Sequence, residues 1–364
     1  MPGRLAIFGP LPPPMTGMEA FTSTLLAELR RADGAAGEWI HVDTSINRSI
    51  AEREKLRAGK VVTLVRQAVR SIVLAARGFR AYYPISQNRI GLVRDLALLL
   101  PFRLARRPIV IHLHGGMLDR VLASEPGLVT RVLRWVVGGR ESRGIVLTPS
   151  LRHCLEPLLP RERIGVVPNT SAVPVWTTQK QQDGPLGVLF VGTLVETKGY
   201  RELITAVAAI RRDGVPIELE VAGEPYAPAD SDWLEHSPRE GIRLLGRIDG
   251  DGKWRAFRRA HVVALPTRYP PEGQPLSIIE GMGAACAIVA TRRDGIVDTV
   301  GETEALLLEP TAGATLEADL ARALRELAGA RGRVAAMGRS ARLRYERDLA
   351  PELFLERWLA AVGR

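Results

Sequence analysis

Residues 270–291 read PPEGQPLSIIEGMGAACAIVAT and carry two glutamates, Glu272 and Glu280, eight positions apart. The stretch follows a short apolar run that we interpret as a β-strand. Glu272 then lies in a loop, and Glu280 lies about one turn inside a helix that Pro275 opens. The first amide groups of that helix, at 276–278, have no partner within the helix and suit an anion such as a diphosphate.

The two carboxylates have two interpretations. Beside an anion site they can hold sugar or ribose hydroxyls without a metal. Alternatively, the helix has an acidic first turn that only favours its own dipole. The spacing alone does not separate these possibilities.

Short apolar runs alternate with longer helical patterns along the chain, which predicts parallel sheets covered by helices on both faces. Two such series indicate two Rossmann-like domains in an α/β fold, whose ligands bind at the carboxyl ends of the strands. We expect strands at 5–9, 40–43, 81–85, 109–114, 144–149, 164–168, 188–192, 218–223, 242–245, 262–266, 287–291 and 305–308. We expect helices at 19–31, 60–77, 119–137, 150–159, 198–212, 253–260 and 277–283, and again from 315 onward.

A polar, aperiodic stretch separates the two series and predicts the domain boundaries. The first domain covers 1–170, a linker covers 171–186, and the second domain covers 187–345. The amphipathic segment at 346–364 is expected to form a helix that packs back on the first domain.

The composition is that of a soluble globular protein, with 46% hydrophobic and 25% charged residues among 364. It excludes disordered, collagen-like and coiled-coil chains. Cys154 and Cys286 are too few for a disulfide framework or a cysteine-based zinc site. No apolar run reaches the length of a membrane span, and the N-terminal stretch is too short and proline-broken for a signal peptide. We therefore expect a cytoplasmic protein.

The net charge of +10 lies entirely in the first half of the chain. Residues 1–180 carry 26 Lys and Arg against 13 Asp and Glu, whereas the remainder carries 24 against 27. The segment 51–107 alone has 13 basic and three acidic residues. Either arginine simply serves as a solubilising residue, or this region meets an anionic partner such as a phospholipid surface, a diphosphate-linked substrate or nucleic acid.

Within this basic segment, Arg66, Arg70 and Arg77 fall on one stripe of the helix expected at 60–77. Such a helix can lie on an anionic bilayer, or it can be a crossover helix whose arginines face water. The second basic stretch, 94–107, is also apolar, which favours the membrane.

The segment 270–291 closely resembles the Glu-x7-Glu donor motif of the retaining glycosyltransferases of family 4, which have the GT-B fold. Further landmarks of that family follow in order over nearly the whole chain. PPPMTGME at 12–19 stands where the family has a Gly-Gly turn, and IHLHGG at 111–116 resembles its His-x-His-Gly. VVPNT at 166–170 and FVGTLVETKG at 190–199 resemble the end of its first domain and its donor-phosphate loop.

The resemblance implies a role for individual residues. Glu272 would contact hydroxyls of the transferred sugar, Glu280 would hold the ribose, and Lys198 would neutralise the departing diphosphate. His114 would lie at the reacting centre, and Gly17 would let backbone approach the phosphates. The other donor-binding positions are Gly192, Thr193, Gly273, Leu276 and Ser277.

Two positions depart from the family pattern. Thr193 replaces the usual arginine after the strand glycine, so Lys198 carries the phosphate charge alone or with another basic residue. Thr16-Gly17 replaces the Gly-Gly turn.

His112 and His114 point to one face of their strand and could be a metal pair, but no third ligand lies nearby in sequence. We expect no metal and no cofactor.

Together these features predict a metal-independent, retaining hexosyltransferase. Its donor would be a nucleoside diphosphate sugar, with UDP favoured over GDP. Its acceptor would be a hydroxyl on a glycan linked to a polyprenyl diphosphate, at the inner face of the membrane, because 86–102 resembles family members that build cell-surface polysaccharides. The alternatives are a soluble acceptor, a sugar-nucleotide epimerase or phosphorylase of the same fold, and a basic RNA-binding module.

Overall fold

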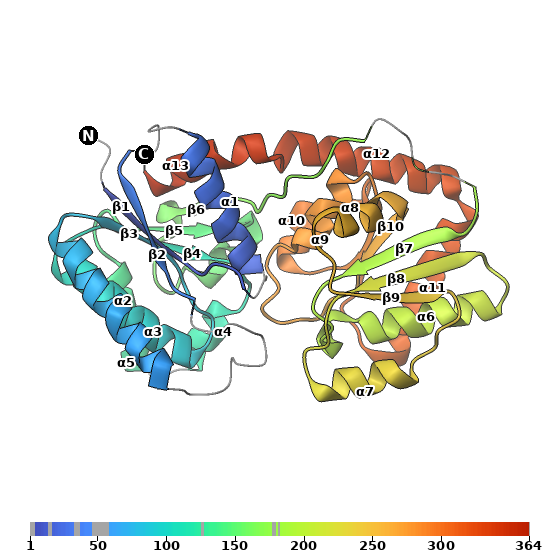
Figure 1. The fold of residues 1–364 in the computed structure, drawn as a ribbon, viewed down its shortest axis with the longest axis horizontal. Helices are drawn as coiled ribbons and strands as arrows, with labels where there is room; N and C mark the ends of the chain where they lie inside the picture. Colours follow the sequence, from blue (N-terminus) through green and yellow to red (C-terminus); the bar gives the residue numbers. More distant parts are fainter. Residues whose placement is uncertain are drawn as a thin grey trace. The chain divides into compact units, whose positions relative to one another are not determined.

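The computed structural model describes residues 4–13, 17–32, 37–45, 58–124, 127–176, 180 and 183–363, with backbone only at 58–61. The chain forms two compact units (Figure 1). Unit 1 comprises Met1–Asn169 together with Pro351–Arg364, and unit 2 comprises Thr170–Ala350.

Unit 1 is built on a six-stranded parallel sheet of order β2-β1-β3-β4-β5-β6. The central strands β1, β3 and β4 are almost entirely buried, as expected for a parallel sheet covered on both faces. The strands are β1 (Leu5–Gly9), β2 (Trp39–Asp43), β3 (Arg80–Pro84), β4 (Ile109–Leu113), β5 (Arg143–Val146) and β6 (Ile164–Val166).

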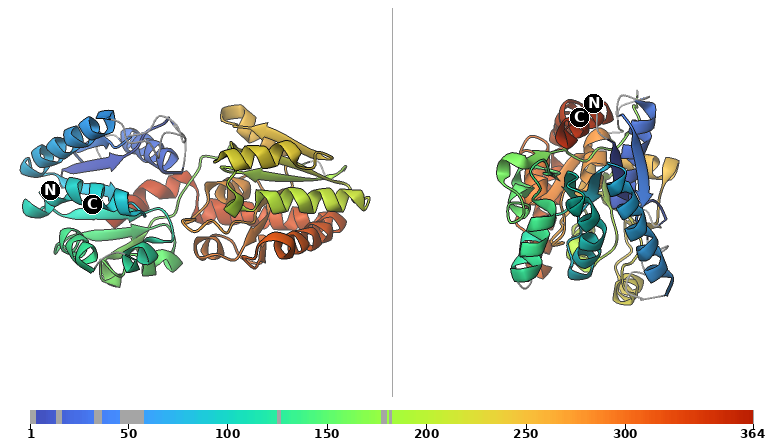
Figure 2. Two further views of the ribbon diagram at one scale, coloured as in Figure 1. Left: turned by 90° about the horizontal axis from the view of Figure 1, so that it is seen from below. Right: turned by 90° about the vertical axis from the view of Figure 1, so that its left-hand side faces the viewer.

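Helices cover both faces of this sheet (Figure 2). One face packs against α2, α3 and α5, and the other against α1 and α13, whose Phe354 and Trp358 are buried beside Leu5 and Ile7. The C-terminal segment therefore belongs to the core of unit 1. The helices are α1 (Gly17–Arg31), α2 (Ala58–Ala76), α3 (Arg89–Leu104), α4 (Leu118–Ala123), α5 (Gly127–Val137) and α13 (Phe354–Val362), and 3₁₀ turns lie at Pro149–Cys154, Arg161–Arg163 and Pro351–Leu353.

Unit 2 repeats the design with a parallel sheet of order β12-β11-β10-β7-β8-β9. Its strands are β7 (Leu186–Val191), β8 (Ile217–Ala222), β9 (Ile242–Gly246), β10 (Val262–Leu265), β11 (Ala287–Thr291) and β12 (Ala305–Leu308). Its helices are α6 (Tyr200–Arg212), α7 (Pro228–His236), α8 (Gly250–Arg259), α9 (Leu276–Gly283), α10 (Asp294–Thr299), α11 (Gly313–Gly329) and α12 (Arg331–Asp348), and a 3₁₀ turn lies at Glu196–Lys198.

The predicted α/β class with two parallel sheets is confirmed, and two helix predictions are wrong. The helix expected at 119–137 is two helices, α4 and α5, because Pro126 lacks the amide that a continuous helix requires. The helix expected at 150–159 is only the 3₁₀ turn Pro149–Cys154, since Pro157 and Pro160 follow closely. The helix α3 had no counterpart among the expected elements.

The structure divides into its two units after Asn169 and after Ala350. The domain limits given in the sequence analysis remain predictions. Residues 171–176 of the predicted linker form irregular chain within unit 2. Residues 14–16 of the predicted phosphate loop, 51–57 of the basic segment, and 177–179 and 181–182 of the linker lie outside the described residues.

Candidate functional site

The loop after β7 brings Lys198 back over the end of its own strand. Lys198 closes the 3₁₀ turn Glu196–Lys198 and does not open a helix at 198, because α6 begins only at Tyr200. A Cβ placed on Gly192 would lie 3.6 Å from Lys198 Cδ and 3.8 Å from its Nζ. The lysine side chain therefore lies along Gly192, which directly follows the strand, with Thr193 next in the chain.

Gly199 locks this loop against the segment that follows β10. Its φ is +74°, a region that favours glycine. A Cβ here would lie 2.3 Å from the carbonyl oxygen of Pro266. The Arg268 amide also donates to the Thr197 carbonyl at 2.6 Å. Two loops from neighbouring strands, β7 and β10, are thus held in close contact at one edge of the sheet.

This contact places Lys198 beside Glu272. Lys198 Nζ lies 3.2 Å from Glu272 Oε2, and the side chains are only 17% and 11% exposed. Thr267 Oγ1 donates to the same carboxylate oxygen at 3.3 Å, and the Lys198 ammonium lies 5.4 Å from the centre of the Tyr269 ring. A cation and a carboxylate are therefore fixed together at the carboxyl end of the sheet.

Glu280 forms a second ion pair that the sequence did not predict. Its Oε1 accepts from Lys253 Nζ at 2.7 Å and from Ser171 Oγ at 2.9 Å, and the carboxylate is buried. Lys253 comes from α8 and lies 4.5 Å from the centre of the Trp254 ring. It supplies a second basic residue to the same end of unit 2, and only its place near the start of a helix could have suggested it.

The start of α9 differs in one respect from the sequence interpretation. The helix begins at Leu276 after Pro275, as predicted, but the Ile278 amide donates to the Pro275 carbonyl at 3.2 Å. The Ile278 group is therefore occupied, and the anion site that we predicted reduces to the amides of Leu276 and Ser277. The preceding Gly273 is buried, and a Cβ on Gly295 would lie 1.9 Å from its carbonyl oxygen.

In unit 1, His114 lies just after β4 and stacks near His112, with ring centres 4.1 Å apart. Phe21 of α1 meets both rings edge-on, and the Tyr82 hydroxyl is hydrogen-bonded to His112 Nδ1 at 2.5 Å. Burial lowers the pKa of His114 to about 3, and it lowers the pKa of His112 well below its usual value. Both rings are therefore neutral at physiological pH.

Gly17 begins α1 in open surroundings, since a Cβ there would meet no described atom within 4 Å. Packing within unit 1 therefore does not require a glycine at this position. His114 and Gly17 belong to unit 1, whereas Lys198, Glu272 and Glu280 belong to unit 2.

Residues 185–329 match the family model described as glycosyl transferases group 1. The matched residues all lie within unit 2. The matched stretch contains Gly192, Lys198, Lys253, Glu272 and Glu280, so both ion pairs lie within it, whereas Ser171 lies before it.

Similar proteins of known name agree with this match. The chain is 27% identical over 199 residues to the glycogen synthase of Mycobacterium tuberculosis H37Rv, an alignment that covers 51% of this chain and 45% of that protein. The chain thus matches less than half the length of this curated relative.

Solved structures establish the fold over the whole chain. HepE from Anabaena, solved with UDP-glucose, superposes with a TM-score of 0.71 at 13% identity and covers 99% of both chains. The lipopolysaccharide outer core galactosyltransferase WaaB superposes with a TM-score of 0.68 at 14% identity, again over 99% of both. The chain therefore has the GT-B fold.

The basic helix of unit 1 has an unusual distribution of side chains. α2 buries Gln67, Ser71 and Leu74 against the unit and turns most of its valines outward. Arg66 and Arg70 are exposed on the same helix, and Arg77 is exposed in the turn just after it, where the predicted helix 60–77 ends one residue early. Arg70 donates to the His41 carbonyl at 3.2 Å. The outward residues Val62, Val65, Val69, Ile72 and Val73 are 47–57% exposed.

The neighbouring helices continue this apolar surface. Helices α2, α3 and α5 lie side by side on one face of the sheet (Figure 1). Ile90, the second residue of α3, is 85% exposed. The remaining exposed apolar residues here are Val93, Leu100 and Leu104 of α3 and Leu128, Val132 and Trp135 of α5. We call this surface, with that of α2, the α2–α3–α5 face. No described helix has both the length and the apolar character needed to cross a bilayer.

Proposed function

We propose that this chain is a retaining hexosyltransferase that transfers a sugar from a nucleoside diphosphate donor, with UDP favoured. The observation that carries this proposal is the Lys198–Glu272 pair over Gly192, inside a group 1 glycosyltransferase domain. HepE, which has the same fold over nearly its whole length, was solved with UDP-glucose, and this supports a nucleotide-sugar donor.

Lys198 would stabilise the leaving diphosphate. Charge develops on the phosphate oxygen as the bond to the sugar breaks, and a fixed ammonium lowers the energy of that state. Donor binding would draw Lys198 from Glu272 toward the phosphate. Glu272 would then accept hydrogen bonds from hydroxyls of the sugar. Thr193, where an arginine is usual, adds no charge, and we assign the second cationic role to Lys253.

Glu280 would hold the ribose through its carboxylate, with Lys253 and Ser171 fixing its orientation. The amides of Leu276 and Ser277 would face the diphosphate at the N-terminus of α9. In unit 1, neutral His114 would lie near the sugar, and Gly17 would admit the phosphates close to the backbone.

We assign a front-side displacement to the reaction. The bond between the anomeric carbon and the donor phosphate oxygen breaks while the acceptor oxygen bonds to the same face of that carbon. The acceptor proton passes to the departing phosphate oxygen, and the anomeric configuration is retained. No side chain forms a covalent intermediate, and the transfer needs no metal.

The test of the donor site is ligand-induced thermal stabilisation by UDP-, GDP-, ADP- and TDP-sugars. The wild type should be stabilised by one nucleotide family, UDP first, and Glu280→Gln should lose most of that shift because a neutral amide binds the ribose hydroxyls less strongly. Glu235→Gln, at an exposed position of α7, is the matched control. Absence of a shift with every nucleotide at millimolar concentration would rule out this function.

We further propose that the acceptor is a lipid-linked glycan and that the protein docks peripherally on the inner membrane face. The α2–α3–α5 face supports this, because exposed valines interleaved with arginines suit an anionic bilayer surface. WaaB, a lipopolysaccharide galactosyltransferase of the same fold, acts on a lipid-bearing acceptor by its name.

Vesicle sedimentation tests the docking. The wild type should sediment with vesicles rich in phosphatidylglycerol. The variant Arg66→Glu/Arg70→Glu/Arg77→Glu should stay in the supernatant. Arg212→Glu/Arg247→Glu/Arg339→Glu makes the same charge change at exposed positions of unit 2 and should still sediment. Equal sedimentation of both triple variants would contradict docking through this face and would favour a soluble acceptor.

A further inference from the structure

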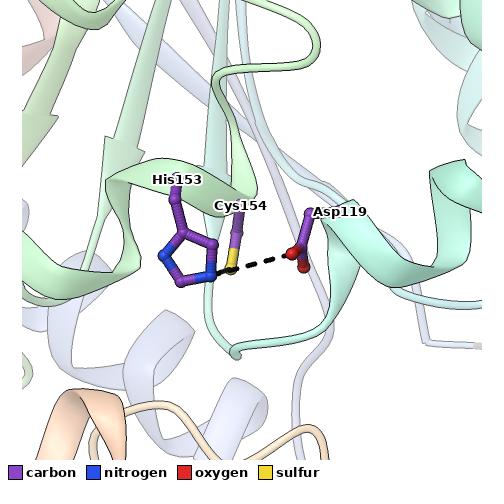
Figure 3. Close-up of side chains that lie close together, drawn as sticks. All are labelled: Asp119, His153 and Cys154. Atoms are coloured by element: carbon purple, nitrogen blue, oxygen red, sulfur yellow. Dashed lines mark hydrogen bonds and ion pairs between the residues drawn. The ribbon is translucent and has the colours of Figure 1, made fainter.

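Three residues with metal-binding side chains converge in unit 1, and none of them has a role in the site described above (Figure 3). Asp119 comes from the first turn of α4, and His153 and Cys154 end the 3₁₀ turn Pro149–Cys154. Their ligand atoms all lie within 4.8 Å of one another. His153 Nε2 lies 3.3 Å from Cys154 Sγ and 3.7 Å from Asp119 Oδ2.

The histidine is held in the tautomer that a metal ligand needs. His153 Nδ1 lies 2.6 Å from the Ser150 carbonyl oxygen, so Nδ1 carries the proton and donates it there. The lone pair of Nε2 then points toward the thiol and the carboxylate. A backbone carbonyl that fixes the second ring nitrogen is the usual support of a metal-bound histidine.

The arrangement does not fit a thiol activated for nucleophilic attack. In such triads the carboxylate holds the ring nitrogen opposite to the one that faces the nucleophile. Here the thiol and the carboxylate both approach Nε2, while Nδ1 is occupied by Ser150. Convergence of three electron-pair donors on one point instead suits a cation.

The carboxylate also has an unsatisfied atom. Asp119 Oδ1 is buried and has no hydrogen-bond partner among the described residues. A buried carboxylate oxygen without a partner is costly, and coordination would compensate its charge. Cys154 is fully buried and forms no disulfide, whereas the His153 side chain is 46% exposed, which leaves a route for an ion to enter.

We propose that Asp119, His153 and Cys154 bind a zinc ion, with a fourth position open to water. Tetrahedral zinc with one sulfur, one nitrogen and one oxygen ligand would set neighbouring ligand atoms about 3.3–3.6 Å apart. The two measured separations from His153 Nε2 bracket this range closely. Thiolate sulfur selects zinc over magnesium or calcium. This site departs from the expectation that the chain holds no metal.

The ion would tie α4 to the turn that follows β5. Asp119 lies five residues beyond His114, so the same link would restrain the loop that carries the candidate catalytic histidine. The inference stands independently of the proposed glycosyltransferase function, since the ligands and their geometry do not involve the donor site.

Cobalt titration of untagged, chelator-treated protein tests the site, because Co²⁺ replaces Zn²⁺ and gives an absorption band from its bond to a thiolate. One equivalent of Co²⁺ should produce the absorption band, and one equivalent of Zn²⁺ added afterwards should abolish it. Cys154→Ser should remove the band, whereas Cys286→Ser, which alters the other buried cysteine, should keep it.

His153→Gln provides a variant at an exposed position that should fold normally and bind at least tenfold more weakly. His236→Gln is its matched control, because His236 Nδ1 also bonds a backbone carbonyl, that of Asp232, at 2.9 Å. Zinc should raise the melting temperature of the wild type and of His236→Gln but not of His153→Gln. No cobalt–thiolate band in the wild type, or saturation only at millimolar metal, would overturn the proposal.

Discussion

Lys198 and Glu272 form an ion pair of 3.2 Å between loops that follow two adjacent strands, β7 and β10, of the unit 2 sheet. The pair is largely buried, so each partner compensates the charge of the other in surroundings with little water. In the proposed function, Lys198 would face the diphosphate of the donor and Glu272 would face the sugar next to it. The ion pair thus joins the two loops, and it keeps both charged side chains in place before the donor binds.

The first prediction concerns the coupling within this pair. Lys198→Met and Glu272→Gln should each lower the free energy of unfolding by about 1–3 kcal/mol, because each leaves a half-buried charged or polar partner uncompensated. The double variant should be less destabilised than the sum of the two, by about 1 kcal/mol or more. Denaturant unfolding of the wild type, the two single variants and the double variant completes this double-mutant cycle. Strictly additive changes in the free energy of unfolding would show that the pair is not coupled.

A second prediction concerns Lys253, which lies 2.7 Å from Glu280. Lys253→Met should weaken UDP binding about tenfold or more, since we propose that the lysine orients the carboxylate that holds the ribose and adds positive charge near the diphosphate. Calorimetric titration with UDP gives the dissociation constant. Lys180→Met, at the amino end of the unit 2 sheet, is the control, and equal affinities for the two variants would exclude a role for Lys253.

Gly17 allows a third prediction that separates folding from binding. Gly17→Ala should leave the melting temperature unchanged or slightly higher, because a Cβ there meets no described atom and alanine favours helix. It should nevertheless lower kcat/KM for the sugar nucleotide, because the new methyl group would stand where we propose that the phosphates approach the backbone. Full activity in Gly17→Ala would remove this residue from the donor site.

The fourth prediction is a pH dependence of stability that comes from His114. Its pKa is about 3 in the folded chain against 6.5 in an exposed chain, so the unfolded state binds more protons between these values. Stability from this group is therefore complete above pH 6.5 and is lost as the pH falls toward 3, at up to about 1.4 kcal/mol per unit. Unfolding by urea at several pH values should show a shallower acid slope in His114→Asn than in the wild type.

The control for this slope is His236→Asn, which changes an exposed histidine of unit 2. Its acid slope should match that of the wild type. If His114→Asn also keeps the wild-type slope, burial of the His114 ring does not govern acid stability.

The strands of both sheets could be predicted from sequence because buried parallel strands are short, continuous apolar runs. The helix α3 could not be predicted, because its own apolar residues are spread over all of its faces and Pro101 lies inside it. The residues of α2 left two interpretations open, and only the burial of Gln67 and Ser71 beneath outward valines showed which side of the helix faces the core.

The candidate site was accessible from sequence only where its residues lie in one motif. Glu272 and Glu280 share a continuous segment, and Lys198 stands next to a glycine that must adopt a positive φ. Lys253 is 27 residues from Glu280, and Asp119 is 34 from His153, so no local spacing connects them. Their proximity follows from where the folded chain places α8 and α9 and from the contact of α4 with the turn after β5, which residue patterns do not encode.

The most direct measurement of the central claim is the release of nucleoside diphosphate from a panel of UDP-, GDP-, ADP- and TDP-sugars, with membrane lipid extract supplied as acceptor. The wild type should convert at least one sugar nucleotide, and Lys198→Met should do so at least about 100-fold more slowly while remaining folded. Wild-type protein that converts none of the panel, or a Lys198→Met variant as fast as the wild type, would contradict the proposed transfer and the role of Lys198 in it.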